Sequence, residues 1–143
     1  MITEFRQENF FLSNFYICGI TYNGMKFTNA EALFQSFKAL GKQHEYCGIS
    51  GKEAKKKGRT EDLPSNWDEA RIPLMEGILR LKFHQNEDLK KRLLNTGDQE
   101  LIEGNYWHDN FWGSCGCKKC GNTGQNHLGK ILMKVREELK ETI

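Results

Sequence analysis

The amino-acid sequence predicts an α+β protein that is rich in helix and has a small antiparallel β ribbon near its N-terminus. The dipeptide Asn23-Gly24 separates two apolar-rich runs at 17–22 and 25–27, which is the strongest short-range signal of a hairpin. The chain contains only two prolines, so few positions interrupt a helix. Its 143 residues, of which 38% are hydrophobic, suit a single domain spanning residues 1–143.

Apolar residues recur at helical spacing through most of the remaining chain. Gly58 suits the C-cap of the second expected helix, and Pro73 either opens or kinks the third. In that third helix, Leu74, Ile78 and Leu81 are expected to face the core. The expected elements are helices at 30–40, 49–57, 67–83, between Asn86 and Gly97, and at 128–140, a brief strand at 101–102, and a glycine-rich loop at 113–129.

The charge balance limits the classes of function. A net charge of +2 is too small for nucleic-acid binding by bulk electrostatics. The run from Lys52 to Arg59 nevertheless holds five cations in eight residues, and it forms either a phosphate site or a solvated helix face. No apolar stretch approaches the roughly 20 residues that span a membrane. Because the N-terminus also lacks a signal-peptide pattern, we expect a cytoplasmic protein.

The first expected helix offers three polar groups on one stripe. At 3.6 residues per turn, Glu31, Gln35 and Lys38 share a face, while Leu33 and Phe37 lie on another that can be buried. Such a helix presents a carboxylate, an amide and an amine together. The alternative is a capping box, in which Thr28 starts the helix and Glu31 only binds an unpaired backbone N–H group.

Other polar and aromatic residues stand where a core does not require them. Ser13 and Asn14 interrupt an aromatic run, Trp67 follows a polar pair, and Asp109 precedes the glycine-rich loop. Asp109 is either a turn former or a reactive carboxylate, and Trp67 and Trp112 are either core residues or platforms for a ligand. This mixture of aromatic rings, carboxylates and amides is typical of a sugar or nucleotide cleft.

The cysteines raise the question of a metal. Five is an odd number, which excludes a complete disulfide framework, and three of them cluster as Cys115, Cys117 and Cys120. A tetrahedral zinc site needs a fourth ligand. Free thiols in a glycine-rich loop explain the cluster equally well, and zinc sites usually combine two separated pairs, so we expect no metal or other cofactor. The candidates for a fourth ligand are His108, His127 and Cys18.

Several motifs resemble those of the YbiA-like NADAR family, and they occur in the same order over nearly the entire chain. They are Phe11-Leu-Ser-Asn-Phe15, Asn29-Ala-Glu-Ala-Leu-Phe-Gln35 with Lys38, Gly58-Arg59, Asn66-Trp67, Met75, Lys82-Phe83, Asp109 with Phe111-Trp112-Gly113, and Gly124-Gln-Asn-His-Leu-Gly129 followed by Leu132-Met133 and Arg136.

The resemblance implies a compact, helix-rich α+β fold and an N-glycosidase activity. Family substrates are ADP-ribose attached to the guanine amino group and ribosylated, phosphorylated pyrimidine intermediates of riboflavin synthesis, and we expect the guanine adduct. The resemblance also implies ADP-ribosylated nucleic acid or a nucleotide-like small molecule as ligand, and partnership with an ADP-ribosyltransferase toxin. A non-catalytic reader of ADP-ribose or nucleotides, and a zinc-dependent structural or nucleic-acid module, remain alternatives.

Site residues follow from the same motifs. Glu31, Trp67 and Asp109 match functionally important positions of the family, and Lys38 matches the lysine that ends its helix motif. We expect Glu31, Lys38 and Asp109 to be catalytic. The chain departs from the family at the cysteine cluster, which replaces a short glycine-rich connection, and this loop is expected to tune specificity. The expected substrate contacts are Ser13, Asn14, Phe15, Gln35, Arg59, Trp67, Trp112, Gly113 and Asn126.

Cleavage of an N-glycosidic bond builds positive charge at the anomeric carbon, or opens the sugar through an imine. Either route needs an anion beside that carbon, a base for water and an acid near the leaving nitrogen. Glu31 or Asp109 can serve as anion and base. Lys38 either holds phosphate and assists the leaving group as a cation, or attacks the opened sugar as a neutral amine.

Overall fold

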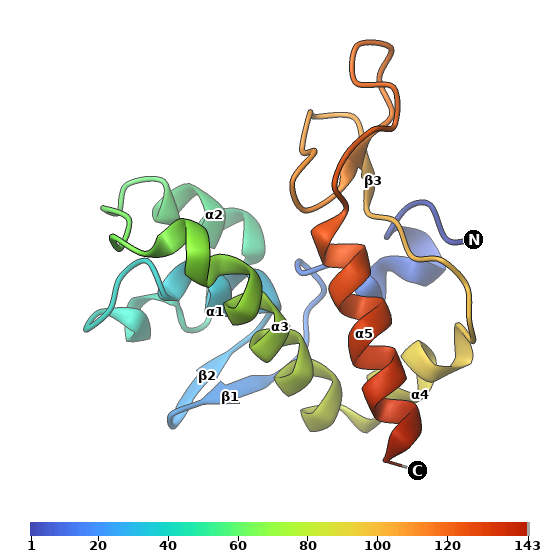
Figure 1. Cartoon of the computed structure of the whole chain (residues 1–143). Coiled ribbons are helices and arrows are strands. Elements are labelled where there is room, and N and C mark those ends of the chain that lie inside the picture. The colour runs from blue at the N-terminus through green and yellow to red at the C-terminus, as the bar shows by residue number, and fades with distance from the viewer. Residues whose placement is uncertain (143) are drawn as a thin grey trace. The chain divides into compact units, whose positions relative to one another are not determined.

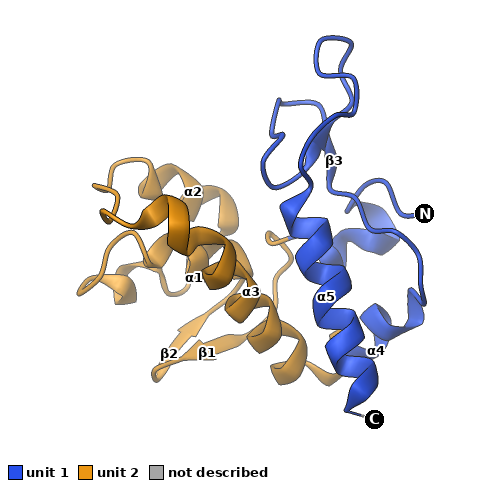
Figure 2. Ribbon diagram, viewed as in Figure 1, with its two compact units in different colours: residues 1–13, 90–143 blue, residues 14–89 orange. Residues whose placement is uncertain are grey.

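The computed structural model describes residues 1–142, and it divides the chain into two compact units, which Figure 2 shows in different colours. Unit 1 combines Met1–Ser13 with Lys90–Ile143, and unit 2 is the continuous segment Asn14–Leu89. The expected α+β class is confirmed, because the described elements are mostly helical and include a small antiparallel ribbon.

Unit 2 begins with the ribbon and continues with α1 (Ala30–Ser36), the short 3-10 helix η2 (Gln43–Tyr46), α2 (Gly51–Gly58) and α3 (Trp67–Gln85) (Figure 1). Strands β1 (Ile20–Tyr22) and β2 (Met25–Phe27) pair with Ile20 opposite Phe27. Asn23 and Gly24 both have positive φ angles, at 49° and 77°, as the predicted two-residue turn requires. Helix α1 contacts η2, α2 and α3.

Unit 1 contains the 3-10 helix η1 (Gln7–Leu12), β3 (Gly104–Asn105), β4 (Ser114–Cys115) and α5 (His127–Glu141), while α4 (Glu87–Asn95) runs across the boundary between the units. Strands β3 and β4 are parallel. The N-terminal segment joins the same unit through Ile2, whose N–H donates to Glu100 O at 2.9 Å and whose carbonyl accepts from Ile102 N at 2.8 Å. The predicted apolar face of α5 is buried, with Ile131, Leu132, Val135 and Leu139 at most 6% exposed.

Three local expectations are wrong. Helix α1 ends at Ser36 instead of continuing to about residue 40, and Lys38 lies in the turn that follows. Gly58 is the last residue of α2 and not its cap, because Arg59 takes the C-cap position. The expected strand at 101–102 is only a single bridge from Leu101 to Ile2.

The buried face of α3 is also shifted from its expected position. The buried residues are Trp67, Met75, Ile78, Leu79, Lys82 and Phe83, whereas Leu74 and Leu81 are only half-buried. Pro73 lies inside the helix at an exposed position. At the far end of α3, the side-chain amide of Gln85 donates to Thr21 O and accepts from Thr21 N, which ties the helix to β1. No helix among residues 1–142 is long and apolar enough to cross a membrane.

Candidate active site

The start of α1 is set by Asn29. Its Oδ1 accepts a hydrogen bond from Ala32 N at 2.7 Å, and its Nδ2 donates to Ile49 O at 2.9 Å, so this residue is the N-cap. In a capping box the glutamate stands at the third helical position, which here is Ala32. The capping-box alternative for Glu31 is therefore wrong. The capping box of unit 2 lies instead at Ser50 and Glu53, at the start of α2.

Glu31 and Gln35 meet one turn apart on α1. The Gln35 side chain donates from Nε2 to Glu31 Oε2 at 2.9 Å, which fixes the direction of one carboxylate oxygen. Gln35 is buried, and its own Oε1 has no hydrogen-bond partner. A Cβ atom at Gly58 would collide with this oxygen, so only glycine leaves room for the amide. This close approach explains the glycine of the Gly58-Arg59 motif better than the expected C-cap role.

Lys38 lies beside Trp67 and within the field of several charges. Its Nζ is 5.5 Å from the centroid of the Trp67 ring. Burial lowers the pKa of the Lys38 ammonium, the charges of Arg59 and Lys55 lower it further, and the charge of Glu31 opposes them. The balance leaves the pKa below its ordinary value, so Lys38 gives up its proton more readily than an exposed lysine.

Of three other predicted residues of unit 2, Asn14 and Trp67 contact this group, and Phe15 lies beside Gly51 of α2. The Asn14 carbonyl accepts from Glu31 N at 3.0 Å, and its side chain donates to Met75 Sδ at 3.4 Å while its buried Oδ1 has no partner. Trp67 is only 8% exposed, which makes it a wall rather than an open platform. Phe15 is 36% exposed and its ring fills the space beside Gly51.

The basic run of α2 divides into paired and exposed cations. Lys57 forms an ion pair with Glu45 at 3.1 Å. Lys52, Lys56 and Arg59 are exposed, which agrees with a solvated helix face and also leaves positive charge along α2 and at its C-cap.

The predicted residues of unit 1 mainly bind the backbone. Asp109 Oδ1 accepts from Phe111 N at 3.2 Å and from Trp112 N at 3.0 Å, so this carboxylate forms a turn. Asn126 donates to Leu101 O at 2.9 Å and accepts from Glu103 N at 3.0 Å, and this use of its amide argues against the expected contact with substrate. A side chain at Gly113 would collide with Glu103 O.

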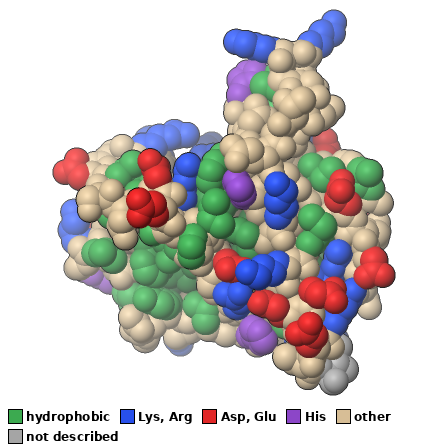
Figure 3. All heavy atoms as spheres, in the orientation of Figure 1, with side chains coloured by type: hydrophobic (Ala, Val, Ile, Leu, Met, Phe, Trp, Pro, Cys, Tyr) green, Lys and Arg blue, Asp and Glu red, His purple; other side chains and the backbone are tan. Residues whose placement is uncertain are grey.

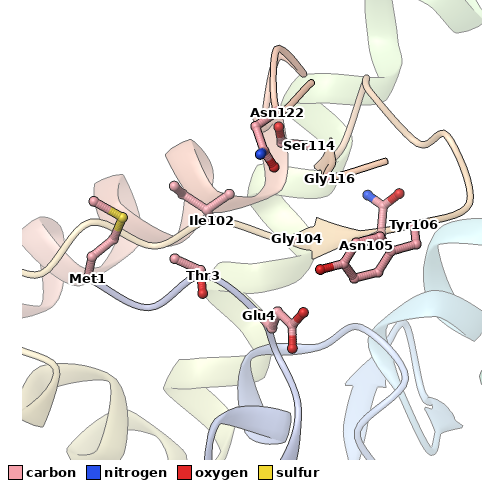
Figure 4. A pocket seen from close by; sticks show the side chains of 10 residues that line it. All are labelled: Met1, Thr3, Glu4, Ile102, Gly104, Asn105, Tyr106, Ser114, Gly116 and Asn122. Carbon is pink, nitrogen blue, oxygen red and sulfur yellow. The ribbon is translucent and has the colours of Figure 1, made fainter. Parts of the chain in front are cut away.

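Two further expected contacts belong to the same unit. Ser13 is half-buried and caps η1 through its backbone N–H, which donates to Phe10 O at 2.9 Å. The Trp112 ring is half-buried and lies 4.9 Å from the Phe111 ring in an edge-on arrangement. Unit 1 has a cavity of about 390 Å³, and none of the residues that line it is an expected site residue (Figure 4).

Lys82 belongs to one of the family motifs but was not among the expected site residues. Its side chain is 0% exposed and its Nζ lies 5.8 Å from the Tyr16 ring centroid. Burial lowers its pKa to about 8, against a smaller opposing effect of Cys18. Lys82 follows Met75 by seven residues and Leu79 by three, so a lysine on an apolar stripe was the signal available in the sequence.

Comparisons with known proteins show the family of this chain. The family model described as NADAR domain matches residues 3–140. The chain belongs to the NADAR family. It is 34% identical over 139 residues to an N-glycosidase of Nostoc punctiforme, covering 92% of this chain and 86% of that protein. It is 33% identical over 132 residues to the N-glycosidase YbiA of Escherichia coli, covering 89% and 79%.

Another relative and a solved structure extend the comparison. A riboflavin biosynthesis protein of Vibrio vulnificus is 37% identical over 136 residues, which cover 92% of this chain but only 36% of that protein. The NMR structure of E. coli YbiA matches with a TM-score of 0.84 and 29% identity, over 99% of this chain and 84% of that one. The fold and the family therefore agree, and this NADAR chain is an enzyme that hydrolyses N-glycosyl bonds.

Proposed function

We propose that this NADAR chain cleaves the bond between a ribose anomeric carbon and a base nitrogen, removing ADP-ribose from guanine in nucleic acid. The observation that carries the proposal is the group formed by Glu31 and Gln35 on α1 and Lys38 in the turn that follows it, with a fixed carboxylate and a lysine of lowered pKa. On this proposal, the partner in the cell is an ADP-ribosyltransferase toxin whose product the enzyme reverses.

Glu31 acts as the anion and base. As the C–N bond breaks, its electron pair leaves with the nitrogen and positive charge grows on the anomeric carbon, where a carboxylate lowers the energy of the transition state. Water then adds to that carbon and gives its proton to Glu31. The hydrogen bond from Gln35 at 2.9 Å orients the carboxylate for both steps.

Lys38 supplies the proton to the leaving nitrogen. Its lowered pKa suits an acid that works near neutral pH, since proton transfer is most effective when the pKa is close to the working pH. The same shift favours the neutral amine that attacks an opened sugar. The two routes differ in whether a covalent adduct forms on Lys38.

The phosphate groups of the substrate are bound by the exposed cations of α2. Lys52, Lys56 and Arg59 supply positive charge at the surface of the same unit that holds Glu31. The unpartnered, buried oxygens of Asn14 and Gln35 offer acceptors for hydroxyl or amino groups of a ligand.

A second substrate class is favoured by one comparison. Because a relative is named as a riboflavin biosynthesis protein, a ribosylated, phosphorylated pyrimidine intermediate of that pathway is the alternative substrate. It contains the same N-glycosidic bond and a terminal phosphate in place of the diphosphate.

Incubation of the protein with both substrates, side by side, tests the proposal. Release of ADP-ribose from ADP-ribosylated guanosine DNA, abolished by Glu31→Gln, is the expected result. Glu87→Gln makes the same change on an exposed helix start and should leave release unchanged. Preferential release of ribose phosphate would identify the riboflavin intermediate as the substrate instead. Tight binding of ADP-ribose without release of either product would identify a non-catalytic reader.

Sodium borohydride, added during turnover, separates the two roles of Lys38. A reduced sugar adduct that mass spectrometry locates on Lys38 would establish the imine route. If Lys38→Arg stays active and no adduct forms, Lys38 acts as a cation. Lys130→Arg, an exposed position on α5, is the matched control.

A further inference from the structure

The loop between β3 and α5 brings three cysteines and one histidine to a single point. The ligand atoms of His108, Cys115, Cys117 and Cys120 all lie within 4.8 Å of one another. The Nδ1 atom of His108 is 3.4 Å from Cys120 Sγ, 3.6 Å from Cys117 Sγ and 3.7 Å from Cys115 Sγ. Of the three expected candidates for a fourth ligand, the structure therefore selects His108.

These distances match a tetrahedron around a zinc ion. With bonds of about 2.3 Å to sulfur and about 2.0 Å to nitrogen, tetrahedral angles place nitrogen and sulfur about 3.5 Å apart. The three separations in the structure, 3.4, 3.6 and 3.7 Å, lie close to that value.

Hydrogen bonding alone does not account for the convergence. Nδ1 of a histidine carries either one proton or one lone pair, so it makes one good hydrogen bond. Three sulfur atoms surround it here. A disulfide would use only two of the three cysteines and would leave the histidine unexplained, and all three are free thiols. A shared central ion gives every one of the four side chains a partner.

The surrounding backbone holds the four side chains in place. His108 has a φ of 68°, which is uncommon for a residue other than glycine. Buried Asn105 fixes this conformation from both sides, because its Oδ1 accepts from Trp107 N at 3.3 Å and Asp109 N at 3.2 Å. Cys120 N donates to Cys117 Sγ at 3.4 Å, an interaction that stabilises a thiolate.

We propose that His108, Cys115, Cys117 and Cys120 bind one structural zinc ion. This reverses the expectation of no metal, which rested on sequence spacing alone. Zinc binding releases the three thiol protons to solvent and leaves neutral His108 bound through Nδ1, so the site carries a net charge of about −1. Lys118 and Lys119 are exposed between the ligands, and Figure 3 shows cationic side chains at the tip of this loop, where they offset that charge.

Four protein ligands leave no open position for water, so the zinc holds the loop rather than taking part in hydrolysis. Gly116 and Asn122 lie beside the ligands in sequence and line the cavity of unit 1 (Figure 4). A metal that fixes Cys115, Cys117 and Cys120 therefore fixes one wall of this cavity. Asp109 follows His108 directly, so its turn is held by the same ion.

Metal analysis of protein purified under reducing conditions tests the proposal without any substrate. One zinc per chain is expected in the wild-type protein and in Cys47→Ser, whose cysteine lies in unit 2 outside the cluster. Cys117→Ser should bind zinc at least about a hundredfold more weakly, since it removes one of four ligands. Wild-type protein with reduced thiols and no zinc, or undiminished zinc in Cys117→Ser, would overturn the proposal.

Cobalt substitution in the wild-type protein gives a second measurement that does not depend on the folding of a variant. Co²⁺ added to metal-free protein should produce the strong visible bands of a tetrahedral site and a sulfur-to-cobalt charge-transfer band, and Zn²⁺ should abolish both. The weak spectrum of an octahedral site would contradict the assignment. Thermal melting should also shift upward by several degrees when Zn²⁺ is added to the metal-free protein.

Discussion

The polar residues of unit 2 and those of unit 1 are used in different ways. Around α1, Gln35 and Asn14 keep buried oxygens without partners, and the pKa of Lys38 is displaced. In unit 1, Asp109 and Asn126 direct their side chains to backbone groups of their own loop. Polar groups that have no hydrogen-bond partner within the protein are candidates for binding a ligand. Polar groups that already have partners stabilise the local structure. On this ground we expect the chemistry at α1 and a supporting role for Asp109 and Asn126.

The largest effect should come from Glu31→Gln. We expect turnover to fall by about a hundredfold to ten-thousandfold, the range of a positioned acid or base. Stability should change little, because Asn29 and not Glu31 caps α1. Steady-state kinetics and denaturant melts check both statements. Near-normal turnover of the variant would contradict the expectation that the catalytic residues lie at α1 of unit 2.

Lys82→Met tests the buried lysine by its effect on stability. The pKa of Lys82 is about 8 in the folded chain, below the ordinary value of 10.5, so the unfolded chain binds more protons between these limits. Burial of the charged Lys82 therefore lowers the free energy of unfolding by its full amount below pH 8. This destabilisation disappears as the pH rises to 10.5. It amounts to about 3 kcal/mol.

Wild-type and Lys82→Met proteins should therefore differ most near pH 7, with the variant more stable, and converge toward pH 10.5. Denaturant melts across this range give the difference directly. A constant difference across the range would show that Lys82 has an ordinary pKa in the folded chain.

Gly58→Ala tests the contact between α2 and the amide of Gln35. The added methyl group displaces that amide and weakens its hydrogen bond to Glu31. We expect a loss of about 1 kcal/mol in stability and up to about tenfold in turnover, the size of one hydrogen bond. Gly77→Ala is the matched control, because a Cβ there meets nothing within 4 Å, and it should stabilise α3 by up to about 1 kcal/mol.

The smallest effect is expected from Asp109→Asn. An asparagine keeps the oxygen that accepts from Phe111 N and Trp112 N, so the turn remains while the charge is lost. Turnover should stay within about threefold of wild type, since we expect Asp109 to hold the turn and not to take part in the reaction. A hundredfold loss with an unchanged melting temperature would instead make Asp109 a catalytic carboxylate.

Sequence patterns predicted the parts of the fold that depend on neighbouring residues. The ribbon at Asn23-Gly24 and the apolar face of α5 are confirmed because turn chemistry and helical periodicity are local properties. The family motifs also drew attention to Glu31, Gln35 and Lys38, of which Glu31 and Gln35 form a hydrogen bond. Their catalytic roles stay predictions.

Contacts between distant residues were not predictable in the same way. Gly58 looked like a helix cap, and only the fold shows that it makes room for an amide on another helix. Lys82 stood in a family motif, but its burial was not predictable, because that depends on the packing of α3. The choice of His108 over His127 as neighbour of the cysteines depended on a positive φ angle that no sequence pattern specifies.

Because unit 1 consists of two separate sequence segments, the parts of the chain can fold only in a certain order during synthesis. Met1–Ser13 leaves the ribosome before unit 2, yet Ile2 finds its hydrogen-bond partners at Glu100 and Ile102 only after some hundred further residues have emerged. Unit 2 is continuous, so its hairpin and helices can form while Met1–Ser13 still lacks its partners in unit 1. Closing that long loop makes the docking of the first residues a late step in folding.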